Sequence, residues 1–190
     1  KNTGEAFNSA LYPEPETQIK FDIDPAIIYG IIRKESSFYP LARSRARATG
    51  LMQIMPATAA FISKDRRFVN KNRHLLNNPD INLKLGQDYI FHLLDTPVVD
   101  QHLFKLLAAY NAGPGNLNKW IKKIDYRGDS FLLLESLPAR ETRAYVKSVT
   151  MNIWIYRLKQ ESNLSQLRTL VHGKIKNGDI AFLRPNVTSN

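Results

Sequence analysis

The 190-residue sequence predicts an all-α fold built as one sizeable domain. Apolar residues recur at helical spacings of three and four along several segments, and no segment alternates apolar and polar residues for more than a few positions. Hydrophobic residues make up 43% of the chain and charged residues 23%, an ordinary globular balance. We therefore expect seven to nine helices with little or no β-sheet.

The first strong helix is predicted to begin at Asp24. This residue is a suitable N-cap, and Pro25 suits the first helical position. Because Pro40 disfavours helical geometry at the residue before it, the helix should end near Ser37 or Phe38.

The other elements are delimited by proline, glycine and capping residues at their ends. The other predicted helices are Phe7–Leu11, Pro56–Ile62, Asp80–Leu94, Leu103–Ala112, Asn116–Ile124 (capped by Asn116), the long helix Pro138–Lys159 and a last helix at Leu164–Val171. The predicted loops are Tyr39–Gly50, the polar excursion loop Ser63–Pro79, and Asp125–Ser130. Two short apolar segments lie at Leu51–Met55 and Phe131–Glu135.

The formal net charge of +10 favours a polyanionic partner, such as nucleic acid, anionic lipid or an acidic cell-wall polymer. No zinc-finger spacing, RNA-binding aromatic signature or block of five basic residues occurs, so nucleic acid is not expected. The basic residues are scattered except for Arg43, Arg45 and Arg47, which share one loop. They either bind carboxylates of a cell-wall polymer or form a solvated loop.

The sequence indicates no membrane span, no signal peptide, and no metal or cofactor site. The sequence has no run of 18 apolar residues, so it predicts no membrane-spanning helix. Residues Asn2–Ser9 are polar, unlike a signal peptide, and the absence of cysteine does not discriminate between compartments. The histidines lack metal-ligand spacing and no phosphate-binding glycine loop occurs, so we expect neither a metal nor a cofactor.

Glu35 is the strongest candidate for chemistry in the first helix. Ile28, Ile31 and Ile32 lie on one helical face, and Glu35 is the next position on that face. A carboxyl group on an apolar stripe is pushed toward its protonated form, which is what a general acid needs. The alternative is a solvated helix-end residue or an ion-pair partner of a nearby arginine.

Four short blocks carry the rest of the functional signal. They are Glu35–Ser37 (ESS), Gly50–Pro56 (GLMQIMP), Ala108–Gly115 (AAYNAGPG), and Glu135–Pro138 followed by Glu141–Val146. In this order and at these distances, the blocks strongly resemble the catalytic domain of the soluble lytic transglycosylases, a bacterial family with a lysozyme-like (goose-type) helical fold that cleaves peptidoglycan. The resemblance spans roughly Asp24 to Tyr156.

The resemblance assigns one catalytic residue and seven binding residues. Glu35 matches the family's single acid/base catalyst. The residues that match substrate-binding positions are Ser44, Gln53, Met55, Tyr110, Asn111, Glu135 and Tyr145. Tyr110 and Ser44 are expected to hydrogen-bond the acid or the substrate's N-acetyl group.

Several of these residues also have structural interpretations. Met55 could belong to the core, and Tyr110 could be a core residue with a satisfied hydroxyl group. Glu135 could pair with Arg140 or Arg143. For Gln53 the sequence favours the site role over a plain core role, because an amide between apolar residues needs hydrogen-bond partners.

The resemblance implies a lytic transglycosylase that cleaves the β-1,4 bond between N-acetylmuramic acid and N-acetylglucosamine without water. One alternative is a muramidase that hydrolyses the same bond and uses Glu135 as its second carboxyl group. Another is a glycan-binding domain without catalysis, although such a domain has no need of Glu35.

The same resemblance suggests the organisation and setting of the chain. We expect residues 1–23 to be a lead-in from a missing N-terminal helical region, residues 24–160 to be the catalytic domain, and residues 161–190 to be an extension. The expected partner is the glycan strand of peptidoglycan, the expected state is a monomer, and the expected location is the periplasm.

Overall fold

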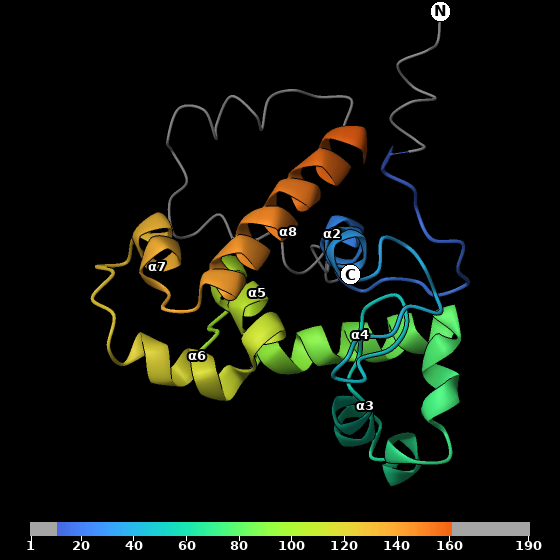
Figure 1. The fold of residues 1–190 in the computed structure, drawn as a ribbon. Helices are drawn as coiled ribbons and strands as arrows, with labels where there is room; N and C mark the ends of the chain where they lie inside the picture. Colours follow the sequence, from blue (N-terminus) through green and yellow to red (C-terminus); the bar gives the residue numbers. More distant parts are fainter. Residues whose placement is uncertain (1–10, 161–190) are drawn as a thin grey trace, which may run out of the picture.

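The computed structural model describes residues 11–160, and this part of the chain is helical (Figure 1). Isolated bridges join Thr49 to Arg43 and to Ile54, and residues 11–160 form no strand. The all-α prediction is confirmed. The helices, including two 3-10 helices (η), are α2 (Pro25–Glu35), α3 (Pro56–Ser63), η1 (Arg66–Val69), η2 (Arg73–Asn77), α4 (Pro79–Leu94), α5 (Leu103–Ala112), α6 (Pro114–Ile121), α7 (Ser130–Ser136) and α8 (Arg140–Gln160).

The pair of helices α2 and α8 forms the centre of the fold. Seven consecutive residues of α2, from Ala26 to Ile32, are buried. At Gly30 the backbones approach so closely that an added Cβ would lie 2.7 Å from Cγ1 of Ile153. Asn152 of α8 also donates a hydrogen bond to the Gly30 carbonyl at 3.3 Å. This contact fixes both helices and therefore the residues at their ends.

Helix α2 begins as predicted but ends earlier. Asp24 is the N-cap, and its side chain accepts a hydrogen bond from the Ala26 amide at 2.8 Å. The predicted end near Ser37 or Phe38 is wrong, because these residues have φ values of 49° and 65° and the helix ends at Glu35. The left-handed turn ends the helix before the restriction from Pro40 applies.

Helix α6 differs from its prediction at both ends. It begins at Pro114 after Gly113, and it ends at Ile121 rather than at Ile124. Asn116 is therefore not the cap, and its side-chain amide donates to the Ala112 carbonyl at 2.9 Å from within the first turn. Proline is well suited to this first position because it has no amide hydrogen to satisfy.

The predicted excursion loop between α3 and α4 contains both 3-10 helices, which are held by Phe68 and Leu76 in the core. The predicted helix at 164–171 and most of that at 7–11 lie outside the described residues. Within 11–160, no helix combines the length and the apolarity that a bilayer crossing requires.

The segment before α2 packs against the helix pair in an extended form. The Tyr156 hydroxyl donates to the Pro13 carbonyl at 2.7 Å, and the rings of Tyr12 and Tyr156 meet edge to face. The Arg33 guanidinium lies 4.2 Å from the centre of the Tyr12 ring. These contacts attach the described part of the lead-in to α2 and α8.

Candidate active site

Glu35 occupies the last position of α2 and meets a tyrosine from α8. The Tyr145 hydroxyl donates a hydrogen bond of 2.7 Å to Oε1 of Glu35. Tyr145 is buried, whereas Glu35 is partly accessible at the end of its helix. The two residues are 110 positions apart in the chain, and the packing of α2 on α8 brings them together.

The protonated form of Glu35 is favoured by its surroundings. Burial raises the pKa of the Glu35 carboxyl group, while the hydrogen bond from Tyr145 and the positive charge of Lys34 oppose that rise without cancelling it. Burial and then the charge of Glu35 raise the pKa values of Tyr110 and Tyr145 well above the ordinary value. Both phenols therefore stay protonated and can donate hydrogen bonds.

Tyr110 of α5 is close enough to Glu35 for the charge of Glu35 to raise its pKa, but its hydroxyl group hydrogen-bonds a different residue. Its hydroxyl donates to the Met52 carbonyl at 2.9 Å, so of the two partners expected for Tyr110, the acid and the substrate's N-acetyl group, it does not bind the acid in this structure. Tyr145 makes that bond instead. Tyr110 thus joins α5 to the GLMQIMP segment.

The loop between α2 and α3 is closed by Gln53 and Ser44. The Gln53 side-chain amide donates to the carbonyls of Ala42 at 3.0 Å and Gly50 at 2.9 Å. The Ser44 hydroxyl accepts from the Ala48 amide at 3.0 Å while the residue remains exposed. Gln53 thus has the partners that its position between apolar residues requires, and Ser44 shapes the loop.

Three other predicted site residues occupy different settings. Met55 precedes α3 and keeps 39% of its surface exposed, so it is not a fully buried core residue. The side-chain amide oxygen (Oδ1) of Asn111 accepts a hydrogen bond from the Thr142 hydroxyl at 2.8 Å. The Glu135 side chain is 60% exposed and pairs with Lys147 at 2.7 Å, rather than with Arg140 or Arg143.

Asn82 of α4 is a site-building residue that sequence reasoning missed. Its buried side chain accepts from the Met52 amide at 2.8 Å and donates to the carbonyls of Thr49 and Leu76, each at 2.9 Å. It therefore joins the GLMQIMP segment, the preceding loop and η2. The only sequence signal was a polar residue within an apolar helical stripe.

Aromatic residues on α3 and α4 were also missed. The Tyr89 ring lies 5.4 Å from that of Tyr110, and His92 stacks on Tyr89 with the ring centres 6.4 Å apart. The exposed Phe61 ring meets His92 edge to face at 5.0 Å. These rings form a row from the vicinity of the acid to the outer face of α3.

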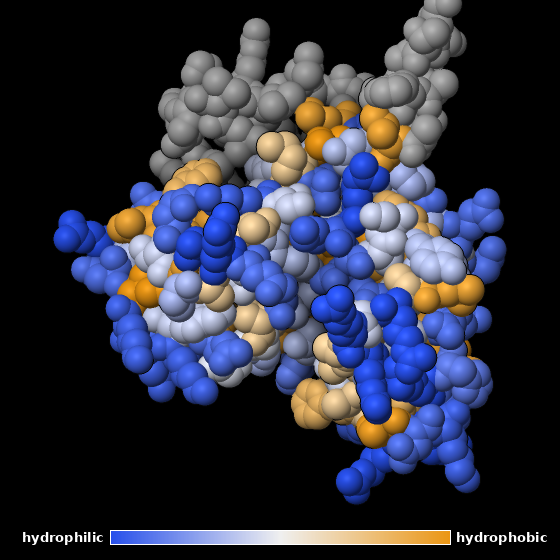
Figure 2. Space-filling model, viewed as in Figure 1, coloured by the Kyte–Doolittle hydropathy of each residue, from blue (hydrophilic) through white to orange (hydrophobic). Residues whose placement is uncertain are grey.

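The surface beside this site is hollowed. Figure 2 shows a recess between the side formed by α3 with the preceding loop and the side formed by α5 to α8. In the described part of the chain, no three histidine, aspartate or glutamate side chains gather as a metal site. The geometry thus defines a helical domain whose most distinctive polar feature is a partly buried carboxyl group that accepts a hydrogen bond from a tyrosine.

The chain belongs to the family described as the transglycosylase SLT domain, whose model matches residues 14–130. It is 35% identical over 137 residues to the soluble lytic murein transglycosylase of Salmonella typhimurium, which covers 72% of this chain and 21% of that protein.

Two solved structures resemble the fold. The X-ray structure of an inactive glutamate-to-glutamine mutant of the lytic transglycosylase Slt from Pseudomonas aeruginosa is 35% identical, with a TM-score of 0.61 over 72% of this chain and 22% of that one. The 70-kDa soluble lytic transglycosylase of Escherichia coli is 29% identical, with a TM-score of 0.63 over 82% of this chain and 24% of that one. The expected lysozyme-like helical fold is confirmed by these neighbours. The chain spans only about a fifth to a quarter of the length of these relatives.

Proposed function

We propose that this chain is a peptidoglycan lytic transglycosylase domain that cleaves the β-1,4 bond between N-acetylmuramic acid and N-acetylglucosamine. The observation that carries the proposal is the partly buried Glu35 carboxyl group, whose pKa is raised by burial and whose Oε1 accepts a hydrogen bond from Tyr145. The names of the relatives, which are lytic murein transglycosylases, support the substrate class. An inactive glutamate-to-glutamine mutant of a relative supports a role for a glutamate.

In the proposed first step, protonated Glu35 donates its proton to the oxygen of the scissile glycosidic bond as the bond to C1 breaks. The N-acetyl oxygen of the muramic acid stabilises the developing positive charge at C1, as in substrate-assisted glycosidases. Glu35 becomes a carboxylate, which the Tyr145 hydroxyl stabilises at 2.7 Å.

In the proposed second step, the Glu35 carboxylate takes the proton from the C6 hydroxyl group of the same sugar. The C6 oxygen then bonds to C1, which gives a 1,6-anhydro product and returns Glu35 to its protonated state. One residue serves as acid and then as base, so no second carboxyl group is needed.

The muramidase alternative receives less support from the surroundings of Glu135. A hydrolase of ordinary type needs a second carboxyl group near the scissile bond. Glu135 was the candidate for this role, and its carboxylate is exposed and paired with Lys147. A non-catalytic glycan-binding domain would have no use for a carboxyl group with a raised pKa.

We also propose that the domain acts in the periplasm, where peptidoglycan lies, and that the remaining predicted residues bind the glycan. Met55 is suitably exposed, and Ser44, Gln53 and Tyr110 shape the wall of the recess on the side of α3. In this proposal residues 24–160 form the catalytic domain.

The test is mass spectrometry of muropeptides after digestion of purified peptidoglycan by the wild type and by Glu35→Gln. We expect wild-type products that are one water lighter than hydrolysis products, and a rate for the variant lower by a factor on the order of 10² to 10⁴. Hydrated reducing ends would instead establish the muramidase, and an equal rate for both proteins would remove Glu35 from the mechanism.

A further inference from the structure

Arginine side chains from two separate segments lie close enough to influence one another electrostatically on the α3 side of the recess. Arg43 and Arg47 are exposed in the loop between α2 and α3, and Arg73 is the first residue of η2. Figure 2 shows strongly hydrophilic side chains gathered over this part of the molecule. We call these three residues the arginine cluster.

The backbone holds the two segments tightly together. An added Cβ at Gly50, which has a φ of 83°, would lie 2.2 Å from the Leu76 carbonyl oxygen. Asn82 donates hydrogen bonds of 2.9 Å to both Thr49 and Leu76. The approach of η2 to the loop is therefore a fixed feature of the fold, and it places Arg73 beside the loop arginines.

Arg73 is the member of the cluster with an unsatisfied group. Its Nη2 atom is buried and has no hydrogen-bond partner among residues 11–160. Burial, and then the positive charges of Arg43 and Arg47, lower the pKa of the Arg73 guanidinium. Such a group destabilises the folded protein, because a buried donor without a hydrogen-bond partner has lost its hydrating water and gained no hydrogen bond in exchange.

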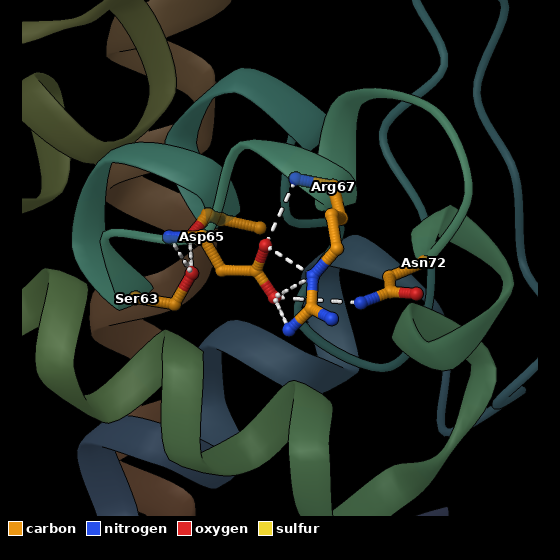
Figure 3. A network of polar contacts seen from close by, with 5 residues as sticks. Ser63, Asp65, Arg67 and Asn72 are labelled. Carbon is orange, nitrogen blue, oxygen red and sulfur yellow. Dashed lines mark hydrogen bonds and ion pairs between the residues drawn. The ribbon is translucent and has the colours of Figure 1, made fainter.

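Asp65, the acidic residue that precedes η1, already has cationic and amide partners within its own segment. Figure 3 shows Asp65 accepting hydrogen bonds from the Arg67 side chain, with Nε and Nη2 each at 2.9 Å, and from Asn72 at 3.4 Å. Among the described residues, no carboxylate forms an ion pair with the arginine cluster. The cluster therefore presents three positive charges without a counterion from this part of the chain.

We infer that Arg43, Arg47 and Arg73 bind a carboxylate group of the short peptide that is attached to muramic acid in peptidoglycan. Guanidinium groups match the planar geometry of a carboxylate and bind it with paired hydrogen bonds. The loop that carries Arg43 and Arg47 also carries Ser44 and borders the recess, so a peptide that leaves the glycan there meets the cluster. The identity of the ligand rests on the proposed function.

The test measures binding without cleavage, in the Glu35→Gln background, by titration calorimetry. Two ligands are compared: glycan fragments that carry their peptides, and the same fragments after enzymatic removal of the peptides. The variants are Arg47→Gln, which alters an exposed side chain, and Arg73→Gln. Arg45→Gln is the matched control, because Arg45 is exposed in the same loop but does not contribute to the lowered pKa of Arg73.

We expect Arg47→Gln and Arg73→Gln each to weaken binding of the peptide-bearing fragments about tenfold, the effect of one charge-assisted hydrogen bond. Binding of the peptide-free fragments should not change, and Arg45→Gln should bind both ligands like its parent. Equal losses on both ligands, equal losses in Arg45→Gln, or no loss in either cluster variant would overturn the inference.

A second readout separates this site from a small-anion site. Without ligand, Arg47→Gln should raise the melting temperature because it relieves repulsion within the cluster, whereas Arg45→Gln should not. If inorganic phosphate protects the wild type against heating while the peptide adds nothing to glycan binding, the inferred ligand is wrong. Failure of the proposed function would appear separately, as absence of cleavage by the wild type in the muropeptide digest.

Discussion

Tyr145 is the residue whose hydroxyl tunes the proposed acid. Its hydrogen bond to Oε1 of Glu35 lowers the pKa of that carboxyl group, against the rise caused by burial. Replacement of Tyr145 by phenylalanine should therefore raise the pKa of Glu35 further and extend the alkaline limb of the pH–rate profile to higher pH. The rate at the optimum should fall about tenfold, because a hydrogen bond to a charged group is lost.

The pH–rate profile of peptidoglycan cleavage by Tyr145→Phe tests this prediction. Tyr156→Phe is the comparison, since that hydroxyl donates to the Pro13 carbonyl and not to the acid. A Tyr145→Phe profile that keeps the wild-type pH limits would show that the hydroxyl does not set the pKa of Glu35.

Glu35 should also reduce the stability of the folded protein at neutral pH. Because its folded-state pKa is raised, its favourable contribution is complete below the ordinary glutamate pKa of about 4.3 and is lost as the pH rises through the raised value. Glu35→Gln should then unfold at a higher temperature than the wild type near pH 7. Thermal melts across pH 3 to 8 should show this gain shrinking toward zero at the acid end, and a gain that is constant with pH would contradict the assignment.

At the scale of elements, the contact between α2 and α8 determines whether the site forms. A Cβ at Gly30 would lie 2.7 Å from the Ile153 side chain and 3.1 Å from the Ile153 nitrogen, so Gly30→Ala must move the helices apart. We expect a loss of about 1–3 kcal/mol in the free energy of unfolding. Urea denaturation measures this loss. Gly115→Ala in α6 is the control, because its Cβ would meet open space and alanine favours a helix by about 0.5–1 kcal/mol.

For the molecule as a whole, Asn82 connects the α3 side of the recess to the rest of the core. Asn82→Ala would leave the Met52 amide and the carbonyls of Thr49 and Leu76 without their buried partner. We expect a loss of about 3 kcal/mol or more in the free energy of unfolding.

Hydrogen exchange tests where the effect of Asn82→Ala is concentrated. Protection should fall first in residues 49–54 and 73–77, while α2 keeps its protection. Asn118→Ala changes an exposed asparagine of α6 and should leave exchange unaltered. Uniform loss of protection across all helices would show that Asn82 does not act locally.

The sequence predicted the helices well because their signals are local. Helix α5 has the predicted bounds at Leu103 and Ala112, and α2 starts at its predicted cap. The burial that raises the pKa of Glu35 followed from its place on an apolar helical face. These features depend on spacings of three and four residues, which a sequence displays directly.

The polar contacts of the candidate site could not be derived in the same way. The partner of Glu35 lies 110 residues away, and Asn82 binds groups 6 to 33 residues distant. Which hydroxyl reaches the acid is decided by how two helices dock, and no local pattern specifies this. The family resemblance matched Tyr110 and Tyr145 to substrate-binding positions, but only the packing of the helices decides which of the two hydroxyl groups donates a hydrogen bond to Glu35.

Polar contacts at the two ends of α2 fix the position of α8 along it. Arg157 contacts Asp24 at 2.6 Å near the start of α2, and Tyr145 contacts Glu35 at its end. The links are separated by 11 residues on one helix and 12 on the other, or roughly 16–18 Å at 1.5 Å per residue. A one-residue deletion between Tyr145 and Arg157 would rotate one link by about 100° relative to the other. The number of residues between Tyr145 and Arg157 in α8 is therefore fixed by the two links, and the hydrogen bond at Glu35 depends on that number.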